Sequence, residues 1–189
     1  MNKNILIVGV GGQGTLLASK IMGNAANLLG LDVKISEVHG MAQRGGSVVT
    51  HVKMGERVFA PVVAKGGADY ILAFEKLEAA RYTEFLKEGG TIIANKKEIY
   101  PMPVIIGAAE YPKDIIEKLK ESFKVVEIDA ESVALELKNP RCANVVMVGA
   151  LLKRMGVSLD IALSALKESV KPEFFAVNAE AMKRGYGIG

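Results

Sequence analysis

The sequence predicts an α/β protein of Rossmann-like architecture, with a mostly parallel sheet, helices on both faces, an inserted β-hairpin and a helical C-terminal third. Three observations indicate this fold class. An apolar run at residues 4–10 ends in glycines and leads into a segment with helical spacing. Short apolar runs then alternate with helical segments as far as residue 128, which is typical of a parallel sheet. From residue 130 onward only helical patterns remain.

The first 38 residues predict a strand, a tight turn, a helix and a second strand. Residues 4–10 form the first strand, and residues 15–29 carry apolar side chains close to helical spacing. Gly30 ends that helix, and the alternation at residues 32–38 predicts the second strand. We expect these elements to form a βαβ unit with a right-handed crossover.

A glycine-rich loop and a β-hairpin are expected next. The loop spans residues 39–46, and residues 47–53 and 57–60 are predicted to pair across a turn at residues 54–56. A conventional NAD domain continues from its second strand into a helix. We therefore expect the surface above the first glycine turn to be partly remodelled in this chain.

The remaining elements alternate before the chain becomes helical. In order, they are a strand at 70–74, a helix at 75–87 closed by Gly89 and Gly90, a strand at 91–95, a helix at 112–123 and a strand at 124–128. Helical segments fill the rest of the chain, with breaks at residues 139–140, 156 and 172. Ser158 is placed to cap the helix that follows it.

The composition predicts one compact domain over residues 1–189. Half of the residues are apolar and 24% are charged, which fits a chain that buries a core of its own. The 24 basic and 21 acidic residues are spread along the sequence, so nucleic-acid binding is not indicated. The apolar run at residues 5–10 is too short for an export signal, and no stretch approaches the roughly 20 apolar residues of a membrane span. We expect a soluble, cytoplasmic protein.

The residue types that usually hold metals are scarce. Cys142 is the only cysteine, which excludes an internal disulfide and any all-cysteine cluster site built from one copy of the chain. Its apolar surroundings indicate a buried small side chain rather than a nucleophile. His39 and His51, the only histidines, are too far apart to argue for a metal site. The sequence therefore predicts neither catalytic nor metal-binding residues.

The segment Gly9-Val-Gly11-Gly-Gln-Gly14 has the spacing of a dinucleotide-binding turn. It follows a predicted strand and opens a predicted helix, where glycines permit close approach of the backbone and the helix N-terminus attracts phosphate. Glu37, near the end of the second strand, is a candidate partner for a ribose hydroxyl. The alternative is that the glycines serve only the packing of strand against helix.

A second glycine loop offers an amide, a guanidinium and bendable backbone near the same edge of the sheet. The alternative is a structural loop whose arginine is merely solvated. Taking both loops together, the candidate cofactor-binding residues are Gly9, Gly11, Gly12, Gln13, Gly14, Glu37, Gln43, Arg44, Gly45, Gly46 and Ser47.

These segments resemble a known family. The stretches at residues 9–19 and 37–47, together with residues 73–75, 89–91 and 139–146, are similar to the gamma subunit of 2-oxoacid:ferredoxin oxidoreductases. The similarity is strongest to the indolepyruvate type, in which the subunit is called beta, and it spans essentially the whole chain. It implies that residues 1–189 form a single gamma-type domain of that family.

The resemblance also implies a reaction and a set of partners. The complex would oxidise a 2-oxoacid with coenzyme A (CoA) to an acyl-CoA and CO2 and would reduce ferredoxin. The Gly-Asp-Gly pattern of thiamine enzymes is absent from this sequence. Thiamine diphosphate, Mg²⁺ and [4Fe-4S] clusters are therefore expected in a larger partner subunit, with CoA as co-substrate and ferredoxin as electron acceptor. This chain is expected to be inactive alone.

Two other functions fit the glycine turn considered by itself. One is a free-standing NAD(P)-dependent dehydrogenase, which Gly9, Gly11, Gly14 and Glu37 would suit although no proton relay is evident. The other is a nucleotide-binding regulatory domain in which the two glycine loops sense a ligand. Binding of NAD(P), or stabilisation by a nucleotide without any partner subunit, would favour one of these.

Overall fold

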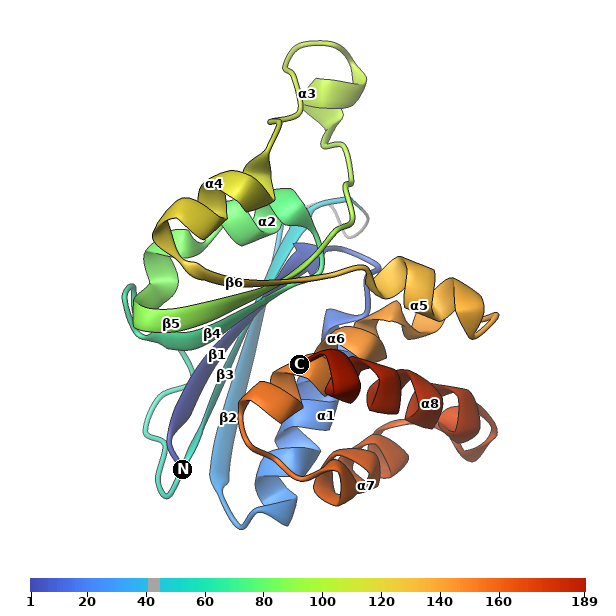
Figure 1. Cartoon of the computed structure of the whole chain (residues 1–189). Helices are drawn as coiled ribbons and strands as arrows, with labels where there is room; N and C mark the ends of the chain where they lie inside the picture. Colours follow the sequence, from blue (N-terminus) through green and yellow to red (C-terminus); the bar gives the residue numbers. More distant parts are fainter. Residues whose placement is uncertain (41–44) are drawn as a thin grey trace.

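A computed structural model describes residues 1–40 and 45–189. Within them lies a sheet of six strands in the order β2-β3-β1-β4-β5-β6 (Figure 1). The strands are β1 (Lys3–Val10), β2 (Asp32–His39), β3 (Ser47–Gly55), β4 (Ala68–Ala73), β5 (Leu86–Asn95) and β6 (Lys124–Ile128). Strands β1, β4, β5 and β6 pair in parallel, whereas β3 is antiparallel to both β1 and β2. The expected α/β fold with a mostly parallel sheet and an inserted hairpin is confirmed.

The position of the hairpin differs from the prediction. β2 and β3 form it, with Asp32 opposite Gly55 and His39 opposite Val48, whereas residues 57–60 form no strand. β3 buries side chains on both faces, as an interior strand must, and it lies between β1 and β2. The predicted pairing was wrong because Met54 and Gly55 continue β3, and because Phe59 beyond them is 81% exposed.

Helices cover both faces of the sheet, as expected. α1 (Thr15–Leu28) and α6 (Ala143–Arg154) lie on one face, with α7 (Leu159–Ser169) packed on α1 and α8 (Pro172–Ile188) packed on α6. α2 (Lys76–Arg81) and α4 (Ile115–Ser122) lie on the other face. Each face therefore has its own apolar core, one under the C-terminal helices and one under α2 and α4.

Two helix boundaries differ from the prediction. The predicted helix at 75–87 ends at Arg81 and is followed by a single 3-10 turn, η1 (Thr83–Phe85). β5 begins at Leu86 and passes through Gly89, whose φ of 72° accompanies a register shift against β4. α4 begins at Ile115 rather than at residue 112, since Asp114 has a φ of 56°.

The C-terminal third is helical with the predicted breaks. α5 (Ala130–Glu136) is followed by the short 3-10 turn η2 (Pro140–Cys142), and Gly156 has a φ of 76° between α6 and α7. The Ser158 hydroxyl oxygen accepts the N–H of Ile161 at 3.4 Å, which caps α7 as predicted. In the described residues, none of the helices has the length and apolar character to cross a bilayer.

Candidate functional site

The glycine turn between β1 and α1 depends on two residues with left-handed backbone. Gly12 has a φ of 99° and Gly14 a φ of 84°. A Cβ added to Gly14 would also lie 2.2 Å from Asn144 Nδ2, so a side chain there is excluded twice. No described side chain caps the first turn of α1. The positive end of the α1 dipole is therefore left for a ligand.

Gln13 shapes the turn from within the protein. Its Oε1 accepts the N–H of Val10 at 2.7 Å, and its Nε2 donates to the carbonyl of Phe74 at 2.9 Å. The side chain thus ties the end of β1 to the end of β4. Gly9 fits beneath it, because an added Cβ would lie 2.9 Å from Gln13 Oε1.

The second glycine loop is joined directly to the first. The N–H of Gly11 donates to the carbonyl of Gly46 at 2.9 Å, and Gly45 has a φ of 80°. Ser47 anchors the far end of the loop, since its hydroxyl donates to Glu78 and lies 3.2 Å from the Tyr82 hydroxyl. The candidates Gln43 and Arg44 lie outside the described residues.

Glu78 and Tyr82 are positioning residues that the sequence reading did not find. Both come from the segment that follows β4, and only the fold places them beneath Ser47. Burial raises the pKa of the Glu78 carboxyl, opposed by the Ser47 hydroxyl and by Arg81 at 3.2 Å. The network fixes the end of the second loop against α2.

Glu37 is engaged by protein groups. Its Oε2 accepts the hydroxyl of Thr50 at 2.7 Å. Its buried Oε1 lies 2.7 Å from His39 Nε2 but has no well-aligned donor among the described residues. β3 separates Glu37 from β1, whereas a ribose-binding acid normally ends the strand beside β1. His39, and not Glu37, lines the hollow of about 650 Å³ beside the glycine turn.

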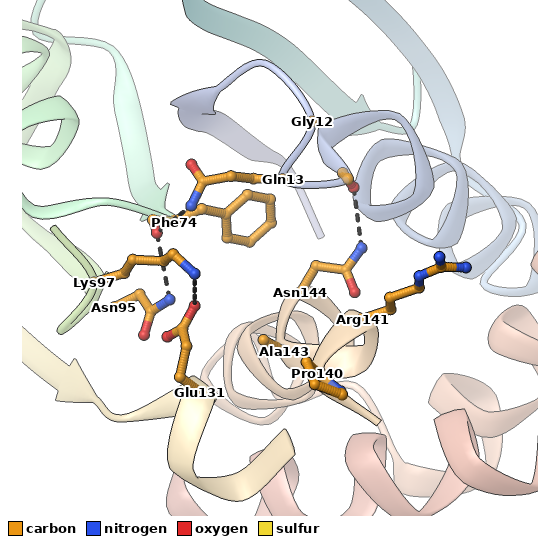
Figure 2. A pocket seen from close by; sticks show the side chains of 11 residues that line it. Gly12, Gln13, Phe74, Asn95, Lys97, Glu131, Pro140, Arg141, Ala143 and Asn144 are labelled. Atoms are coloured by element: carbon orange, nitrogen blue, oxygen red, sulfur yellow. Dashed lines mark hydrogen bonds and ion pairs between the residues drawn. The ribbon is translucent and has the colours of Figure 1, made fainter. Parts of the chain in front are cut away.

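A cavity of about 410 Å³ lies on the other side of the turn, between Gly14 and the start of α6 (Figure 2). We call it the glycine-turn cavity. It is lined by Gly12, Gln13, Gly14, Phe74, Asn95, Lys97, Glu131, Pro140, Arg141, Ala143 and Asn144. It opens at the carboxyl ends of β1, β4 and β5, where open α/β sheets usually bind ligands.

Asn144 faces the glycine turn across this cavity. Its Nδ2 donates to the carbonyl of Gly14 at 3.3 Å, an interaction drawn in Figure 2. Its Oδ1 is buried and accepts no hydrogen bond from the described residues, and the residue as a whole is 9% exposed. A buried amide oxygen without a partner is costly. It therefore points to a ligand that brings an N–H or O–H group.

The charges around the cavity favour an anion. α1 begins there without a side-chain cap among the described residues, whereas α6 continues from η2, whose start is capped by Asn139. Lys97 Nζ pairs with Glu131 at 3.1 Å, while Arg141 forms no ion pair among the described residues. A ligand that carries both a phosphate and a hydrogen-bond donor would satisfy these groups together.

A second cavity of about 580 Å³ continues from the first and shares Pro140 and Arg141 with it. Leu17, Val170 and Phe174 contribute to its lining. We call it the apolar cavity. The two together fit a ligand with an anionic end and a long, less polar portion.

The site residues on the C-terminal side came to light only in the structure. Arg141 and Asn144 lie in the segment 139–146, which the sequence analysis used for the family resemblance but not as a binding site. Lys97 and Glu131 follow β5 and β6, and nothing in their spacing marks them. The one available signal for this part of the site was Arg141, a basic residue that follows Pro140 at the start of a helical segment.

Comparison with known proteins identifies the family of the chain and agrees with its fold. Residues 4–188 match the pyruvate ferredoxin/flavodoxin oxidoreductase family. The chain is 42% identical over 188 residues to indolepyruvate oxidoreductase subunit IorB of Pyrococcus horikoshii, covering 96% of this chain and 93% of that protein. The chain belongs to the pyruvate ferredoxin/flavodoxin oxidoreductase family. Within it, the chain is a gamma-type subunit, which confirms the expectation from the sequence.

Solved structures have the same fold. Pyruvate oxidoreductase subunit PORC of Thermotoga maritima superposes with a TM-score of 0.76 at 22% identity, covering 98% of this chain and 96% of that one. A 2-oxoglutarate:ferredoxin oxidoreductase of Magnetococcus marinus, solved with 2-oxoglutarate, CoA and succinyl-CoA bound, also gives a TM-score of 0.76, at 19% identity. It covers 99% of this chain but 31% of that one, so the fold there is part of a longer polypeptide.

Proposed function

We propose that this gamma-type subunit serves an indolepyruvate-type 2-oxoacid:ferredoxin oxidoreductase and that it holds CoA for the complex. The complex would cleave the bond between the 2-oxo carbon and the carboxylate, release CO2 and join the acyl group to the CoA sulfur. The electron pair freed by this oxidation would pass to ferredoxin. The indolepyruvate assignment rests on the 42% identity to IorB of Pyrococcus horikoshii.

The cofactors of this reaction belong in a larger partner subunit. A cluster such as [4Fe-4S] usually takes four cysteine thiolates, and the chain has one cysteine, Cys142. Thiamine diphosphate with Mg²⁺ would provide the electron sink for decarboxylation, and we assign it to the same partner. The contribution of this chain is then binding and orientation of a substrate.

The observation that carries the CoA assignment is the combination of Arg141 with the buried Oδ1 of Asn144. CoA has phosphates that suit a guanidinium and the N-terminus of α1. It also has amide, hydroxyl and amino groups that can donate to an orphaned oxygen. Free phosphate could also satisfy both groups, but it would leave the adjoining apolar cavity unfilled.

Three polar residues of the cavity then have defined tasks. Arg141 would clamp phosphate oxygens, and Lys97 would add a second charge by turning from Glu131. Asn144, held by Gly14, would orient the ligand through a donor on CoA. The apolar cavity would receive part of the pantetheine arm and exclude water from it.

The test is the CoA dependence of the complex assembled with variant chains. Arg141→Ala should raise the KM for CoA by roughly 10- to 100-fold, because a charge-assisted hydrogen bond contributes about 1.5–3 kcal/mol. The KM for indolepyruvate should stay within about twofold. Arg154→Ala at the opposite, exposed end of α6 is the matched control and should leave both constants unchanged.

Asn144→Leu should also raise the KM for CoA, since it keeps the size of the side chain and removes the acceptor. An unchanged KM for CoA in both variants would reject the CoA assignment. A complex that turns over pyruvate or 2-oxoglutarate faster than indolepyruvate would reject the substrate assignment instead.

A further inference from the structure

An uncharged segment protrudes from the sheet edge next to the glycine-turn cavity. Residues 99–109 contain no charged side chain, and they include the one-turn helix α3 (Met102–Ile105). Figure 1 shows α3 standing out from the body of the protein, beyond α2 and α4. We call residues 99–109 the apolar arm.

The tip of the arm exposes large apolar side chains. Met102 is 66% exposed, Ile105 64% and Ile106 69%. Their spacing of i, i+3 and i+4 places them together on one side of a helical turn. Contiguous apolar surface of this kind usually marks a contact with another molecule.

The arm is ordered by its own hydrogen bonds. The N–H groups of Ala108 and Ala109 donate to the carbonyl of Pro103 at 2.8 and 3.0 Å. Gly107 follows the turn with a φ of 75°. The arm is therefore preformed, which lowers the conformational entropy lost when it binds a partner.

The root of the arm is fixed on both sides to the start of α2. Glu75, which is 1% exposed, accepts the N–H of Ile99 at 3.2 Å and the hydroxyl of Tyr111. The rings of Tyr100 and Tyr111 lie 5.1 Å apart. Glu75 also caps α2 by accepting the N–H of Glu78 at 2.9 Å, so one buried carboxylate fixes both ends of the arm to the start of that helix.

The charges beside the arm favour a protein partner over a membrane. Three lysines and three acidic residues flank it within residues 96–98 and 110–114, so the flanks have no net charge. A segment that inserts into a lipid surface normally has basic flanks that meet anionic headgroups. An uncharged arm between flanks without net charge fits an apolar groove on a protein.

The position of the arm indicates which protein it contacts. A few apolar side chains bury far less than the roughly 800 Å² per partner of a stable interface, so the arm must be part of a wider contact, and its position decides with which molecule. The arm leaves the same end of β5 that provides Lys97 to the glycine-turn cavity. A partner that grips the arm would therefore lie against that cavity.

We propose that the apolar arm inserts into a groove of the larger, thiamine-bearing subunit and aligns the glycine-turn cavity with it. This inference rests on the proposed function, because it requires that such a subunit exists. The arm acts as an anchor at the centre of a wider contact.

The experiment is co-purification of the tagged larger subunit with variants of this chain, followed by titration of the purified subunits. Ile105→Glu/Ile106→Glu should weaken binding at least tenfold, and Ile105→Ala/Ile106→Ala should weaken it by less. Phe59→Glu, at an apolar residue that is 81% exposed elsewhere, is the control and should bind within twofold of wild type. Circular dichroism should show all variants folded, because the altered side chains are exposed.

Different failures have different meanings. If wild-type chain does not bind the larger subunit at all, the proposed function fails. If wild type binds and the arm variants bind equally well, or if Phe59→Glu weakens binding as much as they do, the arm proposal alone is overturned. Sedimentation of isolated wild type as a dimer that the arm variants dissociate, or its flotation with neutral or anionic vesicles, would also overturn it.

Discussion

His51 is a histidine in the interior of the sheet. It lies on β3, is 6% exposed and accepts the N–H of Val63 on Nδ1 at 3.2 Å. Its ring also meets Phe85 edge to face, with centroids 6.1 Å apart. Burial lowers the pKa of this imidazole below its usual value. The residue is therefore a structural acceptor that connects β3 to the segment before β4.

A lowered pKa gives His51 a defined effect on stability. The folded state binds fewer protons than the unfolded state, so the free energy of unfolding should decrease as the pH falls below about 6.5. The slope should be at most about 1.4 kcal/mol per pH unit. His51→Asn, which keeps an acceptor for Val63, should lose this contribution. Urea denaturation between about pH 5 and pH 8 measures it, and equal slopes in both proteins would contradict the assignment.

Single residues show what the local pattern can and cannot predict. The tight turn at Gly12 and Gly14 was predictable from the local sequence, because only glycine readily adopts the positive φ that the turn requires. The partners of Glu37 were not, since they depend on β3 lying between β2 and β1. Asn144 meets Gly14 across a separation of 130 residues, which no local pattern encodes.

Helices α6 and α8 cross with their backbones in close contact. An added Cβ at Gly185 would lie 1.9 Å from the carbonyl oxygen of Val146, and one at Gly149 would lie 2.4 Å from that of Met182. The two backbones therefore touch where both helices have glycine. This packing positions the start of α6, and with it Asn144, against the glycine turn.

A side chain at the crossing should separate the helices. Gly185→Ala should lower the free energy of unfolding by about 2–3 kcal/mol, because the backbone contact leaves no room for a methyl group. Gly187→Ala is the matched control in the same helix, where an added Cβ meets nothing within 4 Å. It should be neutral or stabilising by up to about 1 kcal/mol. Chemical denaturation of both variants compares them, and equal losses would argue against the close crossing.

Elements with a clear period were predicted more accurately than those defined by tertiary pairing. α1 and β6 begin where the pattern placed them, since strong periodicity and glycines bound them. The hairpin was misplaced because residues 47–55 pair with an earlier segment, and alternation alone does not identify the partner strand. α3 was missed because its four residues are too few to show a hydrophobic periodicity and because Pro101 and Pro103 indicate a loop.

The described residues form two cores on one sheet, and the candidate site lies where three distant segments meet. The fold class followed from the sequence because alternating elements allow few arrangements. The candidate site did not, because the glycine turn, the end of β5 and the start of α6 come together only when the C-terminal helices fold back. The family resemblance supplied the function that neither glycine loop determined.

The isolated chain should not catalyse the reaction. Purified protein given indolepyruvate, CoA and an oxidised viologen should give no reduction above background, because its single cysteine cannot hold a cluster and electrons need a carrier. Adding the larger subunit, loaded with thiamine diphosphate, Mg²⁺ and clusters, should restore CoA-dependent reduction with about one copy of this chain per copy of the partner. The larger subunit alone is the control and should be much less active. Turnover by the homogeneous chain without that subunit would place the chemistry in this polypeptide and would refute the division of labour.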